Sequence, residues 1–335
     1  MQGSNQLLSK KLCEVIAVFK TRKVVIIGAG HVGSHVGLAL AQSGEADEIV
    51  LIDIVPNKAA AQAMDIDDAI SGSICGRPCQ VREGSYADLN DADIMIMSFG
   101  RTRKKLEDRL DMFEETVRVA NEVISHLKQV DFQGIMISIS NPADIVCEHI
   151  RRKMQWKRNR CFCTGTGLET FRLVRILTKA TGYSRNSLQA YCMGEHGNSS
   201  FVVWSKVKIL GENFEELCHK DSKLSALDLA DIQHQVRVAA NFIYNNKECT
   251  EFGIANVALK LIKAIFHDEK IVWPCSTALE GEFGQHDVAI GVPCVIGKNG
   301  MEKVYEVELS PEEKGEFTKS CDIIRSYLIR SNEVK

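Results

Sequence analysis

The stretch that decides the fold is KVVIIGAGHVGSHVGLAL, which runs from Lys23 to Leu40. An apolar, β-branched run leads into a glycine-rich turn, and a helical pattern follows directly. Gly28, Gly30 and Gly33 stand in the G-x-G-x-x-G spacing that is typical of a dinucleotide-binding turn. The first glycine allows the tight turn, the second lets backbone approach a pyrophosphate, and the third lets the helix pack on the strand. The stretch therefore predicts a strand, a phosphate-binding turn and a helix.

The residues around this turn indicate which dinucleotide binds. Backbone N–H groups at the start of a helix hold phosphate, and here the predicted helix starts at His31 and Val32. Asp53 lies twenty residues past Gly33, at the end of the next apolar run, EIVLIDI. A carboxylate there accepts hydrogen bonds from both hydroxyl groups of a ribose, and it repels a 2′-phosphate. The sequence therefore predicts NAD, rather than NADP, as the cofactor.

Strand-like and helical stretches alternate through the first half of the chain. The apolar runs KVVIIG, EIVLID, DIMIMS and GIMISIS are short and continuous, as expected for parallel strands that are buried on both faces. Helical stretches such as HVGSHVGLALAQSG separate these runs. The alternation predicts an α/β fold, with a Rossmann doubly wound parallel sheet in an NAD-binding domain over residues 22–163.

The pattern of the sequence changes near residue 160. Longer helical stretches, at 224–246 and 255–266, mix with a strand-like segment, SFVVWSKVKILG, at 200–211. A last helix is predicted after Ser310, because Ser310 and Glu313 form a capping box around Pro311. We therefore expect residues 164–332 to form a second, α+β domain, and residues 1–21 to form a helical N-terminal extension.

The composition argues against several classes of partner. The chain of 335 residues is 45% hydrophobic and 25% charged, and its net charge of −3 favours neither nucleic acid nor an anionic membrane. No apolar run approaches the roughly 18 residues that a membrane span needs. The 12 cysteines are dispersed, without a CxxC pair. We therefore predict no metal site, and reduced thiols in a cytoplasmic protein.

Two short stretches hold single polar residues that suit a ligand site. SNPAD, at residues 140–144, follows a buried run, so Asn141 is predicted at the sheet edge where ligands bind. Alternatively, Asn-Pro only ends the strand. In MGEHGNSSF, at residues 193–201, His196 is either a proton carrier or one more polar residue in a turn.

Two further stretches carry charge in patterns that permit two interpretations. In TGTGLETFRLVRIL, Glu169 and Arg172 share one helix face. They form either a surface ion pair or two separate groups, with Arg172 clamping a substrate carboxylate and Glu169 holding an imidazole. The basic segment SFGRTRKKLEDRLDMF, at residues 98–113, is either a solvated loop or a lid over an anionic substrate. Ser98 and Gly100 directly follow a strand, so we expect them beside the cofactor.

Taken together, these stretches resemble one known family, the NAD-dependent L-lactate and malate dehydrogenases. GAGHVG, DRLDMF, SNPAD, TGTGLETFR, MGEHGNSS and CTEFGIA occur in the family order and close to the family spacing, over about residues 22 to 330. The resemblance implies an oxidoreductase that transfers hydride between NADH and a small 2-oxo acid. It also implies that residues 164–332 form the substrate and catalytic domain, and that the protein is a homodimer or homotetramer.

The resemblance implies a role for each matching residue. His196 resembles the acid–base group, which suits an imidazole because it exchanges a proton near neutral pH. Arg109 resembles a lid arginine that polarises the substrate carbonyl, and Arg172 resembles the clamp on the substrate carboxylate. The other implied roles fall to Asn141, which orients the substrate, Thr250, which lines its pocket, and Ile254, which packs against the nicotinamide.

Two departures from the family pattern bear on the chemistry. Glu169 stands where the family has aspartate, and its extra methylene shifts the carboxylate by roughly a bond length; we expect it to keep the role of orienting the histidine. Arg103 falls on the lid position that faces the substrate side chain, where lactate dehydrogenases usually carry glutamine and malate dehydrogenases carry arginine. An arginine there favours a second carboxylate, because an unpaired buried charge is unfavourable.

The sequence therefore leaves the substrate open. Pyruvate and L-lactate are named first, because most of the matching stretches resemble lactate dehydrogenases, and malate is the alternative. GEHGNSSFVVWS also resembles bacterial L-2-hydroxyisocaproate dehydrogenases, which adds a branched 2-hydroxy acid. Two rival functions are an NAD-dependent glycosidase, which needs a metal site of cysteine and histidine, and a non-catalytic NAD-binding protein.

Overall fold

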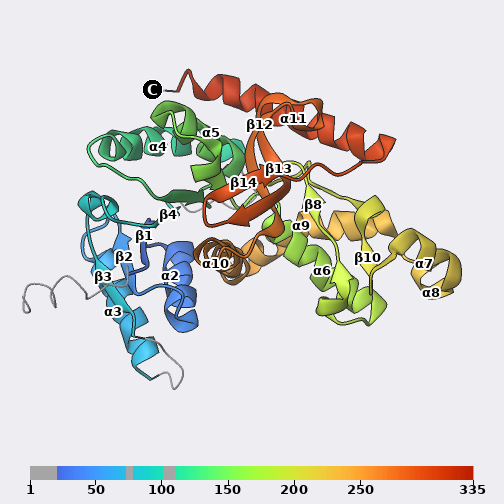
Figure 1. The fold of residues 1–335 in the computed structure, drawn as a ribbon, viewed down its shortest axis with the longest axis horizontal. Helices are drawn as coiled ribbons and strands as arrows, with labels where there is room; N and C mark the ends of the chain where they lie inside the picture. The colour runs from blue at the N-terminus through green and yellow to red at the C-terminus, as the bar shows by residue number, and fades with distance from the viewer. Residues whose placement is uncertain (1–20, 73–77, 101–109, 335) are drawn as a thin grey trace, which may run out of the picture.

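The computed structural model describes residues 21–72, 78–100 and 110–334, and a nine-stranded sheet runs through these residues (Figure 1). The strands from the first half of the chain are parallel to one another. They are β1 (Lys23–Ile27), β2 (Glu48–Ile52), β3 (Gln80–Glu83), β4 (Ile94–Met97), β5 (Ile135–Ser138) and β6 (Cys161–Cys163). Their order, β3-β2-β1-β4-β5-β6, is that of a doubly wound dinucleotide-binding fold, which confirms the predicted fold class.

Helices cover both faces of these parallel strands. They are α2 (His31–Ser43), α3 (Lys58–Ser71), α4 (Phe113–Leu127) and α5 (Ala143–Met154). Successive residues of a strand point to opposite faces. Val24 and Ile26 of β1 therefore join the core that holds the buried residues of α2 and α3, whereas Val25 and Ile27 join the core that holds most buried residues of α4 and α5. All of β1 is buried, as the continuous apolar run predicts.

The second half of the chain extends the same sheet and builds smaller sheets beside it. β12, β13 and β14 continue the sheet beyond β6, each antiparallel to the strand before it. The smaller sheets have the orders β11-β10-β7 and β8-β9. These strands are β7 (Leu188–Gln189), β8 (Cys192–Met193), β9 (Phe201–Val202), β10 (Lys208–Ile209), β11 (Glu212–Asn213), β12 (Ile271–Glu280), β13 (His286–Gly297) and β14 (Gly300–Val304).

The helices of the second half pack on the sheet, on one another and on helices of the first half. They are α6 (Gly167–Thr181), α7 (Phe214–Lys220), α8 (Ser222–Ser225), α9 (Leu229–Lys247), α10 (Phe252–Phe266) and α11 (Pro311–Ser331). α10 packs on α2, so the two halves of the chain meet next to the glycine-rich turn. Short 3₁₀ turns link other elements, namely η1 (Tyr86–Leu89), η2 (Leu110–Met112), η3 (Arg158–Arg160), η4 (Arg185–Ser187), η5 (Trp204–Lys206) and η6 (Glu282–Gly284).

The predicted start of the last helix is confirmed in detail. The Ser310 side chain accepts a hydrogen bond from the Glu313 N–H at 3.2 Å, and the Ser310 N–H donates to the Glu313 carboxylate at 2.9 Å. This reciprocal capping satisfies two N–H groups that a helix start otherwise leaves without partners.

Two predicted elements are wrong in their bounds. The helix predicted over 224–246 begins only at Leu229, because the Asp228 side chain accepts from the Asp231 N–H and caps the helix there. The strand predicted over 200–211 is broken by η5, because its two ends pair in different sheets: β9 with β8, and β10 with β7. The chain must turn between these two pairings.

The remaining predictions concern the N-terminus and the membrane. The helix predicted over residues 1–21 lies almost entirely outside the described residues, which begin at residue 21. Among the described residues, none of the helices combines the length and the apolar character that crossing a membrane requires.

Candidate active site

The glycine-rich turn between β1 and α2 is shaped by close backbone contacts. Gly28 has a φ of +101°, and a Cβ atom there would meet the Ser98 carbonyl oxygen at 2.5 Å. A Cβ atom on Gly33 would overlap the Gly28 carbonyl oxygen, whereas one on Gly30 would find nothing within 4 Å. Gly28 and Gly33 are therefore required by packing, and the turn is open at Gly30. That open side fits the close approach of a pyrophosphate to the backbone.

Asp53 follows β2 and braces this turn. Its Oδ2 accepts a hydrogen bond from the Ala29 N–H at 2.8 Å, and its Oδ1 accepts one from the Val55 N–H at 2.9 Å. Lys58 Nζ lies 3.8 Å from the same carboxylate, which is only 8% exposed. Asp53 thus connects the glycine turn to the end of β2. Its hydrogen bonds to a ribose stay a prediction.

A cavity of about 270 Å³ lies beside the turn, at the carboxyl ends of β4 and β5. Many of the residues singled out from the sequence line this cavity: Gly30, His31, Val32, Ser98, Gly100, Asn141, His196, Thr250 and Ile254. Others are described but are not part of the lining: Gly28, Gly33, Asp53, Glu169 and Arg172. Arg103 and Arg109, the two predicted lid arginines, lie outside the described residues.

His196 is connected through a carboxylate to a buried arginine. The ring Nδ1 of His196 lies 2.9 Å from Glu169 Oε2, and Arg172 Nη1 donates to Glu169 Oε1 at 3.0 Å. The exposed fractions are 7% for His196, 2% for Glu169 and 5% for Arg172. The alternative of a surface ion pair between Glu169 and Arg172 is therefore wrong, because both side chains are buried. The glutamate reaches the imidazole despite its extra methylene.

Asp144 also contacts His196, although its sequence pattern alone does not single it out as a site residue. Asp144 Oδ2 accepts a hydrogen bond from the His196 backbone N–H at 2.8 Å. Burial raises the pKa of the Asp144 carboxyl to about 6, against a lowering effect of its hydrogen-bonded neighbours. A signal was present in SNPAD, since an acidic residue in the first turn of a helix that follows a buried strand lies at the same sheet edge.

Asn141 has an unused hydrogen-bonding atom at the cavity. Its side-chain Oδ1 is buried and has no hydrogen-bond partner among the described residues. Buried polar atoms in folded proteins are nearly always satisfied, so an atom of this kind at a cavity indicates a donor that arrives with a ligand. The open turn at Gly30 and the buried Asn141 oxygen lie in one cavity, which fits a dinucleotide bound along it.

The cavity therefore connects a phosphate-binding turn to a histidine whose ring is hydrogen-bonded to a buried carboxylate. A fold that brings a nicotinamide dinucleotide next to a group able to carry a proton defines a dehydrogenase.

Comparisons with known proteins assign the family. Residues 22–163 match the lactate/malate dehydrogenase NAD binding domain, and residues 166–332 match the lactate/malate dehydrogenase alpha/beta C-terminal domain. The chain belongs to the lactate/malate dehydrogenase family. It is an oxidoreductase that uses NAD and acts on a 2-hydroxy acid.

Individual relatives match over nearly the whole chain. An L-lactate dehydrogenase of Fusobacterium nucleatum is 36% identical over 93% of this chain and 97% of its own length. An L-lactate dehydrogenase of Mesomycoplasma hyopneumoniae is 38% identical over 91% of this chain and 96% of its own.

Solved structures of the same family superpose closely. The minor L-lactate dehydrogenase of Enterococcus mundtii has a TM-score of 0.88 and 30% identity, covering 93% of this chain and 98% of its own. The malate dehydrogenase of Cryptosporidium parvum has a TM-score of 0.89 and 26% identity, covering 93% and 99%. The backbone is thus shared by enzymes named for two different substrates.

Proposed function

We propose that this enzyme is an L-lactate dehydrogenase, which interconverts pyruvate and L-lactate with NADH and NAD. The observation that carries the proposal is the buried hydrogen bond between His196 and Glu169, at the cavity that the glycine turn also borders. The curated relatives described above, which are 36% and 38% identical to this chain, are both named L-lactate dehydrogenase.

His196 moves the proton in this proposal. When bound, NADH would supply the hydride for reduction of pyruvate at its carbonyl carbon. Glu169 engages Nδ1, so Nε2 is the ring nitrogen that donates a proton to the carbonyl oxygen and takes it back during oxidation of lactate. The buried Glu169 carboxylate fixes the orientation of the ring and stabilises the imidazolium whenever the ring carries the proton.

The other residues bind the substrate or the cofactor. Arg172, held in place by Glu169, clamps the substrate carboxylate, and Arg109 stabilises charge on the reacting oxygen. Asn141 orients the bound molecules through its buried oxygen. Thr250 lines the substrate pocket. The cofactor lies against five residues of the turn, Gly28, Gly30, His31, Val32 and Gly33, and against Asp53, Ser98, Gly100 and Ile254.

Malate is the second candidate substrate, and Arg103 is the observation that favours it. The residue lies in the basic segment 98–113, at a position where arginine suits a substrate with a second carboxylate. Facing the methyl group of pyruvate, the guanidinium would have to remain in solvent, because a desolvated and unpaired charge is strongly unfavourable.

Specificity constants separate the two substrates. We expect kcat/KM with NADH to be highest for pyruvate, lower for oxaloacetate and 2-oxoisocaproate, and we expect Arg103→Gln to leave this order unchanged. A wild-type preference for oxaloacetate that Arg103→Gln abolishes would replace lactate by malate as the substrate. The highest value for 2-oxoisocaproate would identify a branched 2-hydroxy acid dehydrogenase.

We also propose a homodimer or homotetramer in the cytoplasm. Phe242 on α9 and Phe252 at the start of α10 are 73% and 60% exposed, which suits apolar surface that a second copy covers. All ten cysteines in the described ranges are free thiols, as is usual in a reducing compartment. Sedimentation equilibrium measures the number of subunits, and a monomer at micromolar concentration would contradict the oligomer.

A further inference from the structure

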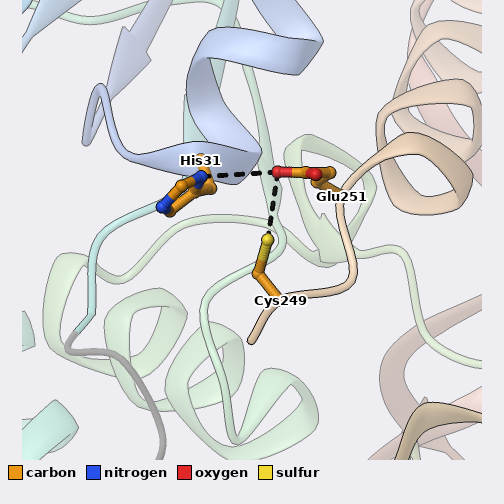
Figure 2. Close-up of side chains that lie close together, drawn as sticks. All are labelled: His31, Cys249 and Glu251. Carbon is orange, nitrogen blue, oxygen red and sulfur yellow. Dashed lines mark hydrogen bonds and ion pairs between the residues drawn. The ribbon is translucent and has the colours of Figure 1, made fainter. Parts of the chain in front are cut away.

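A histidine, a cysteine and a glutamate from distant parts of the sequence meet at the edge of the cofactor cavity. His31 is the first residue of α2, and Cys249 and Glu251 belong to the loop between α9 and α10. Figure 2 shows His31 and Cys249 both directed at the Glu251 carboxylate. His31 Nδ1 lies 3.5 Å from Glu251 Oε2, and the Cys249 thiol donates to the same oxygen at 3.0 Å. Each side chain offers one atom that can bind a metal, namely an imidazole nitrogen, the thiol sulfur and a carboxylate oxygen, and these three atoms lie within 4.8 Å of one another.

Glu251 is held so that its Oε2 is the atom that both His31 and Cys249 approach. The other carboxylate oxygen, Oε1, accepts a hydrogen bond from Lys247 Nζ at 2.6 Å, and the side chain is only 8% exposed. A ligand that is hydrogen-bonded through its second atom is oriented in advance, as is usual around metal sites in proteins. The imidazole of His31, by contrast, is 75% exposed and free to adjust its position.

We propose that His31, Cys249 and Glu251 bind a divalent transition-metal ion of the zinc class, with water as the fourth ligand. Imidazole nitrogen, thiolate sulfur and carboxylate oxygen are the ligand types that Zn²⁺ takes, whereas Mg²⁺ and Ca²⁺ prefer oxygen alone. Tetrahedral coordination at about 2.0–2.3 Å separates the ligand atoms by roughly 3.3–3.7 Å. The 3.5 Å between His31 Nδ1 and Glu251 Oε2 already fits this spacing. The Cys249 sulfur lies closer to Oε2, at 3.0 Å, and has to move away from it by less than about 1 Å.

Binding of the metal changes the protonation of Cys249. Burial, followed by the hydrogen bond to Glu251, raises the pKa of the Cys249 thiol to about 11, so the thiol carries its proton in the absence of metal. Coordination breaks the S–H bond and forms a bond from sulfur to metal, and the proton passes to the solvent.

His35 is close to the cluster but is not one of the proposed ligands. Its Nδ1 lies 3.5 Å from Glu251 Oε2, as the Nδ1 of His31 does. However, His35 Nδ1 also lies 2.6 Å from the backbone carbonyl oxygen of His31, so this nitrogen carries a hydrogen and donates it. A nitrogen that donates a hydrogen bond has no lone pair for a metal.

The proposed site shares two residues with the cofactor cavity. His31 and Cys249 both line the cavity, from the glycine turn on one side and the α9–α10 loop on the other. A metal that joins them ties these two walls together and adds a hydrated ion between them. We therefore expect bound metal to hinder entry of the dinucleotide, and bound dinucleotide to hinder the metal by the same factor.

Cobalt tests the site without any measurement of turnover. Titration of the metal-stripped, full-length enzyme with Co²⁺ should give one site with a thiolate-to-cobalt charge-transfer band. Cys249→Ser should lose the band, and His31→Ala should weaken Co²⁺ binding by about tenfold or more. Cys218→Ser and His234→Ala are the matched controls, since Cys218 is also partly exposed and His234 lies on the surface of α9 away from the cluster. Both controls should bind Co²⁺ as the wild type does.

Loss of the band in Cys249→Ser supports the proposal only if the variant is folded. Far-ultraviolet circular dichroism and NADH binding by the variant are the checks on its fold. An equal band in Cys249→Ser and in the wild type would overturn the proposal, and so would the absence of stoichiometric Co²⁺ binding. Saturating Zn²⁺ should weaken NADH binding at least about fivefold in the wild type and leave it unchanged in Cys249→Ser. Equal NADH affinity with and without Zn²⁺ in the wild type would contradict a metal at this cavity.

Discussion

Glu169 determines how His196 is held, although it is one methylene longer than the aspartate that the family pattern leads one to expect. The first turn of α6 places the side chain so that each carboxylate oxygen has a separate partner, His196 for one and Arg172 for the other. The longer side chain is therefore accommodated by the positions of its partners. Shortening the Glu169 side chain to aspartate should therefore break a contact of this carboxylate, although aspartate is the residue of the family pattern.

Glu169→Asp should lower kcat/KM by about 100-fold, because the carboxylate moves by roughly 1 Å or more from His196 Nδ1. Glu169→Gln keeps the length but removes the charge that stabilises an imidazolium, so we expect a loss of about 1,000-fold or more. NADH affinity, measured by fluorescence, should stay unchanged in both variants. Activity of Glu169→Asp within about threefold of the wild type would show that the distance at this position does not matter.

At the scale of elements, α5 connects the active site to the core. Its first turn holds Asp144 against the His196 backbone. Further along the same helix His149 is buried against α4, where its Nε2 lies 2.8 Å from Asn121 Oδ1. Burial, assisted by the nearby charges of Lys153 and Arg152, lowers the pKa of His149 to about 4. The folded protein therefore keeps this histidine neutral at a pH where the unfolded chain protonates it.

His149 should make the protein sensitive to mild acid. Above pH 6.5 the ring is neutral in both states, and between pH 6.5 and 4 only the unfolded state gains the proton, so stability falls as the pH falls. Between pH 7 and pH 5 the wild type should lose about 2 kcal/mol more free energy of unfolding than His149→Gln. Urea unfolding at the two pH values measures this difference, with His234→Gln as an exposed control. Parallel losses in wild type and His149→Gln would rule out the assignment.

The elements could be predicted from the sequence where local pattern and tertiary packing agree. β1 and α2 follow from a continuous apolar run and a glycine turn, and the start of α11 follows from its capping residues. The sequence predicts one strand over 200–211 because its residues favour a strand, yet its two ends pair with different sheets. Such a choice of pairing partners depends on distant parts of the chain.

At the scale of the whole molecule, the contact between His196 and Glu169 could be predicted, but most of the surroundings of His196 could not. His196 and Glu169 lie in stretches with recognisable patterns, whereas the role of Asp144 depends on how β5 and the His196 loop are brought together. His31 and Cys249 are more than 200 residues apart, so no spacing rule for metal ligands detects them. The division into domains at residues 163 and 164 stays a prediction, because β12 to β14 continue the sheet that the first half builds.

The most direct test of the account is the oxidation of NADH with pyruvate, in the wild type and in His196→Gln, together with NADH binding by both proteins. We predict that the wild type turns over with kcat/KM for pyruvate of at least about 10⁴ M⁻¹s⁻¹. His196→Gln should lose about 100- to 10,000-fold of this value and still bind NADH as tightly as the wild type. The contradicting result is a wild type that binds NADH tightly but oxidises it with neither pyruvate nor any other 2-oxo acid. That result would indicate a protein that binds the nucleotide without catalysis.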